Sequence, residues 1–249
     1  MTNEITVEYA VEMTCKDCTT DIEAALSSIK GIDSSKFDLE RETVILKGTF
    51  QPSLVVEKLY SIGKTAIIRG AGTNGVQNTG DGLGAAVCIL ENYTKVGKYP
   101  EGSTMGLIRL IQVQDDVCYM DVSISDVPSG DYIISPRQNG DLSNVPSSNG
   151  KEFKFGHSQN ESQKPIVVNI NESGAGKLWL DCIGWKIYEI IGRSILVSKI
   201  NHSKVDYASS PILSGIVARS SGVFENDKTV CSCSGKTLWE ESKMMRQKA

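Results

Sequence analysis

Apolar and polar side chains alternate near the start of the chain, where Ile5, Val7, Tyr9 and Val11 are separated by polar or small residues. This period of two predicts a half-buried strand. Further along, apolar residues at helical spacing predict two helices among additional extended runs. After the first strand, the predicted elements are a helix carrying 22–29, a hairpin of 32–39 and 43–47, a helix over 52–62 and a last strand over 65–68. The order β-α-β-β-α-β predicts a ferredoxin-like α+β domain over residues 1–70.

A different pattern begins at residue 85. Short apolar runs bounded by Gly, Pro, Asn, Asp and Ser fill residues 85–222 and predict an all-β sandwich or barrel. The clearest of these runs are 85–90, 105–113, 118–124, 132–134, 166–170, 195–197 and 216–218. Six glycines from Gly70 to Gly84 predict a flexible linker over residues 71–84. Residues 223–249 are polar and predict a short irregular tail.

Charge and composition exclude several classes of partner. The 249 residues contain 26 Lys and Arg against 30 Asp and Glu, a net charge of −4, so we expect no basic surface for nucleic acid or anionic lipid. No apolar stretch approaches the roughly 20 residues that span a membrane, and the first nine residues lack the pattern of a secretory signal. We therefore expect a reducing compartment, where cysteines stay thiols unless they bind metal or do redox chemistry. The two histidines exclude a site built on several imidazoles.

Two of the seven cysteines, Cys15 and Cys18, form a C-x-x-C pair where the first strand hands over to the first helix. Two thiolates three positions apart in such a loop can face one ion, and the helix N-terminus favours their negative charge. Sulfur donors suit Cu(I), whereas a structural zinc site needs four ligands and residues 1–70 offer no second pair. Met13 and the surrounding β-α-β motif favour an open Cu(I) site. A redox dithiol or a chance pair are the alternatives.

A second pair, Cys231 and Cys233, lies in the polar tail. Residues i and i+2 of an extended chain point to opposite sides, so binding of one ion needs a bend, which Ser232, Ser234 and Gly235 permit. An exposed pair of this kind can bind Cu(I) or exchange disulfides. Two surface thiols without a role are the alternative.

The other residues with chemical potential are expected to be structural. Three cysteines in apolar runs are predicted to be small buried hydrophobes, and two histidines in polar surroundings to be surface residues. Three tryptophans are expected to anchor the core, an interface or the tail. These residues are Cys88, Cys118, Cys182, His157, His202, Trp179, Trp185 and Trp239.

Together these features resemble the copper chaperones for copper/zinc superoxide dismutase, the fungal form most closely. Residues 13–18 (MTCKDC) resemble the M-x-C-x-x-C loop of heavy-metal-associated domains, and Lys64 matches a position close to that loop in single-domain copper carriers. The segments 192–194 (GRS) and 215–218 (GIVA) resemble signatures of the dismutase barrel, and 230–240 resembles the C-terminal CxC segment of the chaperones. The resemblance implies that the central region is a Greek-key β-barrel.

The departures from the dismutase pattern imply a barrel without the dismutase metals. In place of the H-x-H copper motif, this chain has Ser135-Pro136-Arg137 before Gly140-Asp141, and a later copper histidine falls near Ser198. Pro146 and Ser214 stand near the positions of the two disulfide cysteines. The resemblance implies that the barrel is kept for recognition. The partner surface that it implies, here called the docking face, consists of Gly192, Ile216, Val217, Ala218 and Arg219.

The interpretation that follows is a metallochaperone and not an enzyme. Cys15 and Cys18 would acquire Cu(I), and the barrel would bind copper/zinc superoxide dismutase as a heterodimer. Cys231 and Cys233 would deliver copper and form the client's disulfide, a sulfhydryl-oxidase-like activity. A thiol–disulfide oxidoreductase, or a superoxide dismutase with an added metal-binding domain, are the alternatives, and a homodimer stays open. The resemblance implies a cytoplasmic location with a second pool in the mitochondrial intermembrane space.

Overall fold

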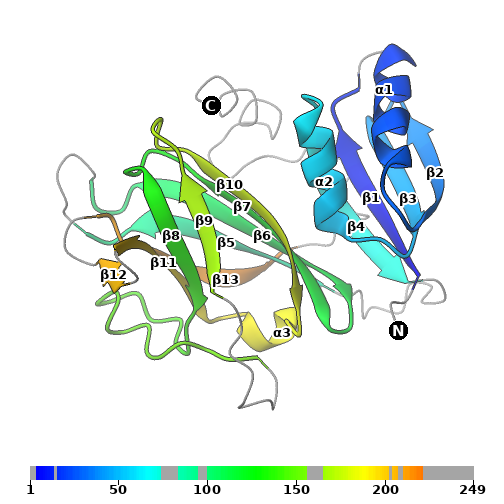
Figure 1. Cartoon of the computed structure of the whole chain (residues 1–249). Coiled ribbons are helices and arrows are strands. Elements are labelled where there is room, and N and C mark those ends of the chain that lie inside the picture. The colour runs from blue at the N-terminus through cyan, green and yellow to red at the C-terminus, as the bar shows by residue number, and fades with distance from the viewer. Residues whose placement is uncertain are drawn as a thin grey trace.

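The computed structural model describes residues 4–13, 16–73, 84–94, 100–155, 165–201, 204–206 and 210–220. Within these ranges the chain forms a four-stranded sheet with two helices, followed by a larger antiparallel sheet that curls into a barrel (Figure 1). None of the helices described is long and apolar enough to cross a membrane.

The first region is the predicted ferredoxin-like domain. Its strands are ordered β2-β3-β1-β4, all neighbours antiparallel, so that β1 lies at the centre. The elements are β1 (Ile5–Val11), α1 (Lys16–Ser27), β2 (Ile32–Asp38), β3 (Thr43–Gly48), α2 (Pro52–Ser61) and β4 (Ala66–Thr73). The alternating side chains Ile5, Val7, Tyr9 and Val11 are buried. They pack with apolar side chains of both helices in one core. The predicted α+β domain is therefore confirmed.

Local chemistry sets the limits of α2. Pro52 occupies its first turn, where a missing N–H costs nothing because it would have no helical partner. The chain leaves the helix through Gly63, whose φ of 79° suits a residue without a Cβ. Lys64 follows at once, and its backbone N–H still donates to Leu59 O at 2.9 Å.

Strand β4 continues past the predicted end of the first domain. Gly70 lies opposite Glu8 and Gly72 opposite Thr6 in the β1–β4 ladder, so residues 71–73 belong to a strand and not to the predicted linker. The glycine content predicted a linker because glycine is common in linkers. Here, however, hydrogen bonds with the backbone of β1 keep residues 71–73 in a strand. Residues 74–83 of the predicted linker lie outside the described ranges.

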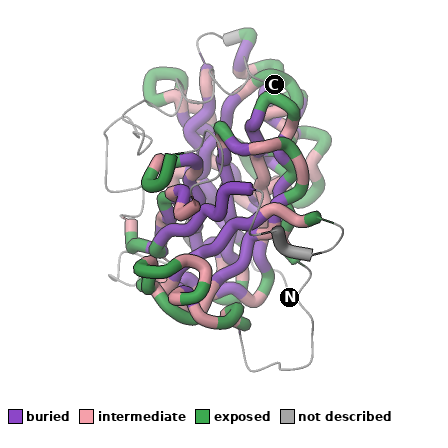
Figure 2. Tube along the Cα trace, turned by 90° about the vertical axis from the view of Figure 1, so that its left-hand side faces the viewer, coloured by how far each residue is buried: buried purple, intermediate pink, exposed green. Residues whose placement is uncertain are grey.

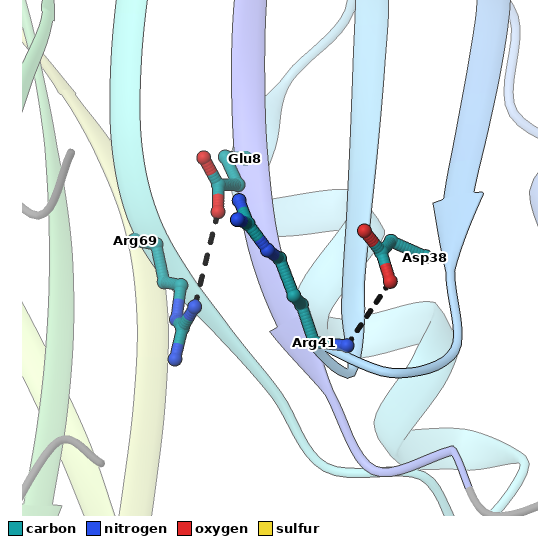
Figure 3. A network of polar contacts seen from close by, with 4 residues as sticks. All are labelled: Glu8, Asp38, Arg41 and Arg69. Carbon is teal, nitrogen blue, oxygen red and sulfur yellow. Dashed lines mark hydrogen bonds and ion pairs between the residues drawn. The ribbon is translucent and has the colours of Figure 1, made fainter. Parts of the chain in front are cut away.

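An ion pair bridges the same two strands. The β1–β4 register shifts between Glu8 and Tyr9, which leaves Arg69 as the extra residue of the irregularity. Its guanidinium Nη1 lies 3.9 Å from Glu8 Oε1, and Figure 3 shows the two side chains directed toward each other. In the neighbouring hairpin the backbone N–H of Arg41 donates to Asp38 Oδ1 at 3.0 Å, which closes the turn between β2 and β3.

The second region is a nearly closed antiparallel barrel. Eight strands follow the order β10-β7-β6-β5-β13-β11-β8-β9, and the end strands β9 and β10 lie in contact. The jump from β7 to β8 and the return of β10 beside β7 are Greek-key connections, as the resemblance implied. The elements are β5 (Ala85–Asn92), β6 (Thr104–Gln114), β7 (Val117–Ile124), β8 (Gly130–Pro136), β9 (Ile166–Ile170), β10 (Gly176–Ile183), α3 (Ile187–Ile190), β11 (Ser194–Asn201), β12 (Lys204–Asp206), which pairs with β11, and β13 (Leu213–Ser220).

Strand β6 is buried on both of its faces. Ile108 and Leu110 point into the barrel core, whereas Ile111 and Val113 join the core of the first domain. Alternate side chains of a strand point to opposite faces, so β6 separates two apolar layers. Figure 2 shows buried segments running along the strands, with exposed segments mostly in the loops.

Aromatic contacts hold the two regions together at α2 and β10. The Tyr60 ring on α2 lies 4.9 Å from the Trp179 ring on β10, and Lys177 Nζ lies 5.1 Å from the same tyrosine ring.

Within the barrel core, the Trp185 ring stacks on the Phe155 ring at a centroid distance of 4.3 Å. These positions agree with the predicted roles of Trp179 and Trp185 as interface and core anchors.

Candidate metal centre and docking face

Cys18 is the last residue of the predicted metal loop, residues 13–18, and lies in the first turn of α1. The helix begins at Lys16, so the unpaired N–H groups and the positive end of the helix dipole favour negative charge in this turn. The Cys18 side chain is largely buried, 9% exposed, in the core that also holds Met13 and Ile22. Cys15, the other predicted ligand, lies outside the described ranges.

Lys64 brings a positive charge to the cysteine from the end of α2. Its Nζ lies 3.1 Å from Cys18 Sγ, although the two residues are 46 positions apart. An ammonium at this distance donates a hydrogen bond to sulfur and favours the thiolate, the form that binds metal. The predicted closeness of Lys64 to the metal loop is therefore confirmed.

The three cysteines predicted to be structural are buried thiols. Cys88 and Cys118 are 0% exposed and Cys182 is 5% exposed. Burial raises the pKa of the Cys88 and Cys118 thiols to about 12 and raises that of Cys182 as well. Such thiols stay protonated at neutral pH, so they are poor nucleophiles and poor ligands.

The described part of the barrel holds no cluster of metal-ligating side chains at the expected dismutase positions. Ser135 on β8 and Ser198 on β11 are buried, and Arg137 is used to hold a loop, with its Nη2 donating to Gly150 O. No group of three or more His, Cys, Asp or Glu side chains close enough to hold a metal occurs among the described residues. His157 and His202 lie outside those ranges, as do Cys231, Cys233 and Trp239.

The docking face divides into exposed and buried members. Ile216 is 42% exposed, and Gly192, Ala218 and Arg219 are exposed beside it. Val217 is only 1% exposed because it points into the barrel core. Of the predicted docking face, only the other four residues are therefore accessible at the surface, and Val217 belongs to the barrel core.

Two polar contacts between distant segments were not predicted. Ser53 at the start of α2 bonds to Asp181 on β10, and Asn149 in the β8–β9 loop bonds to Ser194 and Ser214. Serine, asparagine and aspartate are common surface residues. Nothing in the neighbouring sequence distinguishes the residues of these contacts from other polar residues of the same types. Only the fold brings the pairs together.

The sequence was compared with known protein families and with characterised proteins. The family model of the heavy-metal-associated domain matches residues 8–65. Over 258 aligned residues the chain is 36% identical to "Superoxide dismutase 1 copper chaperone" of Saccharomyces cerevisiae, covering 98% of this chain and 97% of that protein. The protein of the same name from Kluyveromyces lactis is 35% identical, with coverages of 97% and 94%. "Copper chaperone for superoxide dismutase" of Mus musculus is 29% identical, with coverages of 94% and 88%.

Proposed function

Because the chain belongs to the copper chaperones for superoxide dismutase, we propose that it carries Cu(I) on cysteine thiolates, docks a dismutase subunit and transfers the ion to it. The observation that carries the proposal is the 3.1 Å contact between Lys64 Nζ and Cys18 Sγ in the first turn of α1. A cation aimed at a cysteine beside a helix N-terminus is an arrangement for holding a thiolate.

Charge and coordination number explain how such a site can both hold and release its ion. Cu(I) bound by the thiolates of Cys15 and Cys18 carries a net charge of −1, which the ammonium of Lys64 offsets. Two sulfur ligands leave the ion open to attack by a third thiolate. Transfer then proceeds by ligand exchange, in which a new Cu–S bond forms as an old one breaks and copper stays Cu(I).

The barrel would supply recognition. The exposed residues Gly192, Ile216, Ala218 and Arg219 present a small face with one large apolar side chain at the barrel surface. A surface of this kind can pair with the equivalent face of a dismutase subunit in a two-fold-like heterodimer, as isologous interfaces do. Loss of the copper ligands at Ser135 and Ser198 leaves recognition as the role of the domain.

The tail would complete delivery. Cys231 and Cys233 are two thiols in a polar segment, and such groups can reach a partner's sulfur. When they start as a disulfide, a client thiolate attacks one sulfur and forms a mixed disulfide, and a second client thiolate then displaces the tail cysteine. The client loses two electrons and gains its disulfide, while Cys231 and Cys233 become two thiols.

The test is Cu(I) titration of the full chain followed by X-ray absorption spectroscopy and activation of copper-free superoxide dismutase. We expect two or three sulfur ligands and no imidazole nitrogen, with activation lost in the variant that carries both Cys15→Ser and Cys18→Ser. Nitrogen ligands and dismutase turnover by the chain itself would instead support the appended-dismutase alternative. Formation of the client's disulfide without copper transfer would support the oxidoreductase.

A further inference from the structure

Asn149 is a fully buried amide in the long loop between β8 and β9. Its side chain is 0% exposed. Its Nδ2 donates to Ser194 Oγ at 2.9 Å and to Asp141 O at 3.1 Å, and it lies 3.5 Å from Ser214 Oγ. The loop thereby reaches β11, which begins at Ser194, and β13, which carries Ser214. These partners satisfy the buried NH₂ group, because an unpaired donor in the interior is costly, whereas Oδ1 has no hydrogen-bond partner among the described residues.

The two serines are arranged to accept from Asn149. The Ser194 hydroxyl donates its one hydrogen to Asn139 O at 2.5 Å, and the Ser214 hydroxyl donates to Ile195 O at 3.0 Å. Each oxygen can then only accept from the asparagine. The cluster therefore requires a hydrogen-bond donor at position 149.

The serines that Asn149 holds adjoin the docking face. Ser194 follows Gly192 by two residues, and Ser214 precedes Ile216 by two. The backbone joins the two segments directly, since Gly192 N–H donates to Val217 O and Val217 N–H donates to Arg193 O, both at 2.8 Å. A shift of either serine would therefore move the face itself.

The loop also contacts the docking face directly, at Gly192. A Cβ placed on Gly140 would lie 2.0 Å from Gly192 O, so backbone meets backbone there. Arg193 secures the contact: its Nε donates to Glu189 O, its Nη1 to Gln138 O, and its guanidinium lies 4.1 Å from the Phe153 ring. Residues 137–155 and the docking face are thus one connected unit.

We propose that Asn149 is the positioning residue of the docking face, clasping the 137–155 loop to β11 and β13 through hydrogen bonds in place of a covalent link. The described cysteines Cys18, Cys88, Cys118 and Cys182 are all free thiols. The clasp contains no sulfur, so the face keeps its shape in reducing and oxidising solution alike. A chaperone that must meet a client before the client's disulfide exists is served by such a face. The inference rests on the proposed docking of a dismutase.

The decisive variant is Asn149→Asp, which keeps the shape but replaces the donating NH₂ with an oxygen facing three acceptors. We expect the dissociation constant for copper-free superoxide dismutase, measured by calorimetry, to rise at least tenfold, while Cu(I) affinity stays within twofold. Asn144→Asp makes the same change at an exposed site of the same loop and should leave both constants unchanged. Hydrogen exchange of the Gly192 and Val217 amides in the free wild-type chain should be equal with and without a thiol reductant.

A second variant separates positioning from general stability. Val168→Ala removes buried volume on β9, and it should lower the unfolding midpoint without weakening docking. Hydrogen exchange of the free chain should quicken at Gly192, Ser194 and Val217 in Asn149→Asp and stay slow in β6 and β7. Should Asn149→Asp fail to fold, Ser194→Ala, which removes the 2.9 Å acceptor, should show the same localised exchange.

Unchanged exchange at those three amides would overturn the proposal. So would docking that weakens no more in Asn149→Asp than in Val168→Ala, or exchange at Gly192 and Val217 of the free wild-type chain that depends on the reductant. If the wild-type chain does not bind a dismutase at all, the proposed function fails, and the exchange measurements still decide what Asn149 does in the free chain.

Discussion

Ser53 and Asp181, 128 residues apart, join the metal-binding domain to the barrel. Asp181 Oδ2 accepts hydrogen bonds from the Ser53 hydroxyl at 2.5 Å and from the Ser53 backbone N–H at 3.2 Å. The residue before α2, Gln51, makes no side-chain cap. A carboxylate from the barrel therefore caps the helix that ends beside the metal loop, which couples the orientation of α2 to the position of β10.

Replacement of Asp181 by alanine should loosen this junction. We expect the free energy of unfolding to fall by about 1–2 kcal/mol, the usual cost of a lost helix cap, because the Ser53 N–H and hydroxyl lose their acceptor. Chemical denaturation of the full chain measures the loss. Asp33→Ala, at an exposed position of β2, is the control and should change stability by no more than about 0.5 kcal/mol.

The same carboxylate should make stability depend on pH. Burial raises the pKa of Asp181 above its ordinary 3.8, and the bonds from Ser53 oppose the rise without cancelling it. The folded chain then binds this proton more tightly than the unfolded chain, so wild type should gain stability relative to Asp181→Asn as pH falls from neutral toward 3.8, with no further gain below.

The groups that face Asp181 sharpen this test. The phenols of Tyr9 and Tyr119 interact with it electrostatically, and burial with nearby carboxylates raises the pKa of both. They stay neutral over the acidic range, so they add no titration of their own. A stability difference between wild type and Asp181→Asn that does not vary between pH 7 and pH 4 would contradict the prediction.

Loss of the Lys64 charge should weaken copper binding. A hydrogen bond to a charged group is worth about 1.5–3 kcal/mol, and partial exposure reduces this, so Lys64→Ala should lower Cu(I) affinity roughly tenfold. Competition with a Cu(I) chelator measures the change. Lys64→Arg should retain most of the affinity, and Lys36→Ala, on β2, should retain all of it. Equal affinities for wild type and Lys64→Ala would remove Lys64 from the metal site.

Docking should depend on Ile216 and not directly on Val217. A glutamate at position 216 would be buried unpaired in the complex, at a cost of a few kcal/mol, so binding to superoxide dismutase should weaken at least tenfold with folding preserved. Ile183, 72% exposed and outside the docking face, provides the control Ile183→Glu. By contrast, Val217→Ala should reduce stability by about 1–2 kcal/mol, because it opens a space in the barrel core.

The tail cysteines should matter for delivery and not for binding. A chain with Cys231→Ser and Cys233→Ser should fold and dock nearly as wild type, because the sequence around the pair is polar and the described barrel core does not include it. Client activation, and the mixed disulfide on non-reducing gels, should disappear. Full activation by this variant would show that Cys15 and Cys18 suffice.

The sequence predicted the parts of the fold that rest on local pattern. Strict alternation in 5–11 and the glycine and proline punctuation of the first domain lead directly to its split β-α-β motif. Strand β10 was not among the predicted runs, because Lys177 and Asp181 interrupt its apolar side chains. Both charged side chains face the first domain. The sequence around β10 gives no sign that another domain packs there, so the strand could not be predicted from it.

In the candidate site, too, residues in local motifs could be predicted, whereas contacts between distant residues could not. Cys18 was found from a motif, and Lys64 from a family resemblance, but the Ser53–Asp181 and Asn149 contacts join residues 45 to 128 positions apart. Pairings of this kind depend on the final packing of two domains or of a loop on a sheet. Short polar side chains carry no signal of them in the sequence.

Strand β6 is buried on both faces, and this affects whether the barrel can be produced without the first domain. Ile111, Val113 and Tyr119 are shielded only because the first domain covers them, and Trp179 is partly buried at the same boundary. A barrel produced without residues 4–73 would expose these apolar side chains to water beside the charged Lys177 and Asp181, and newly exposed apolar surface favours self-association. We therefore expect isolated barrels to self-associate through the face that the first domain covers in the full chain.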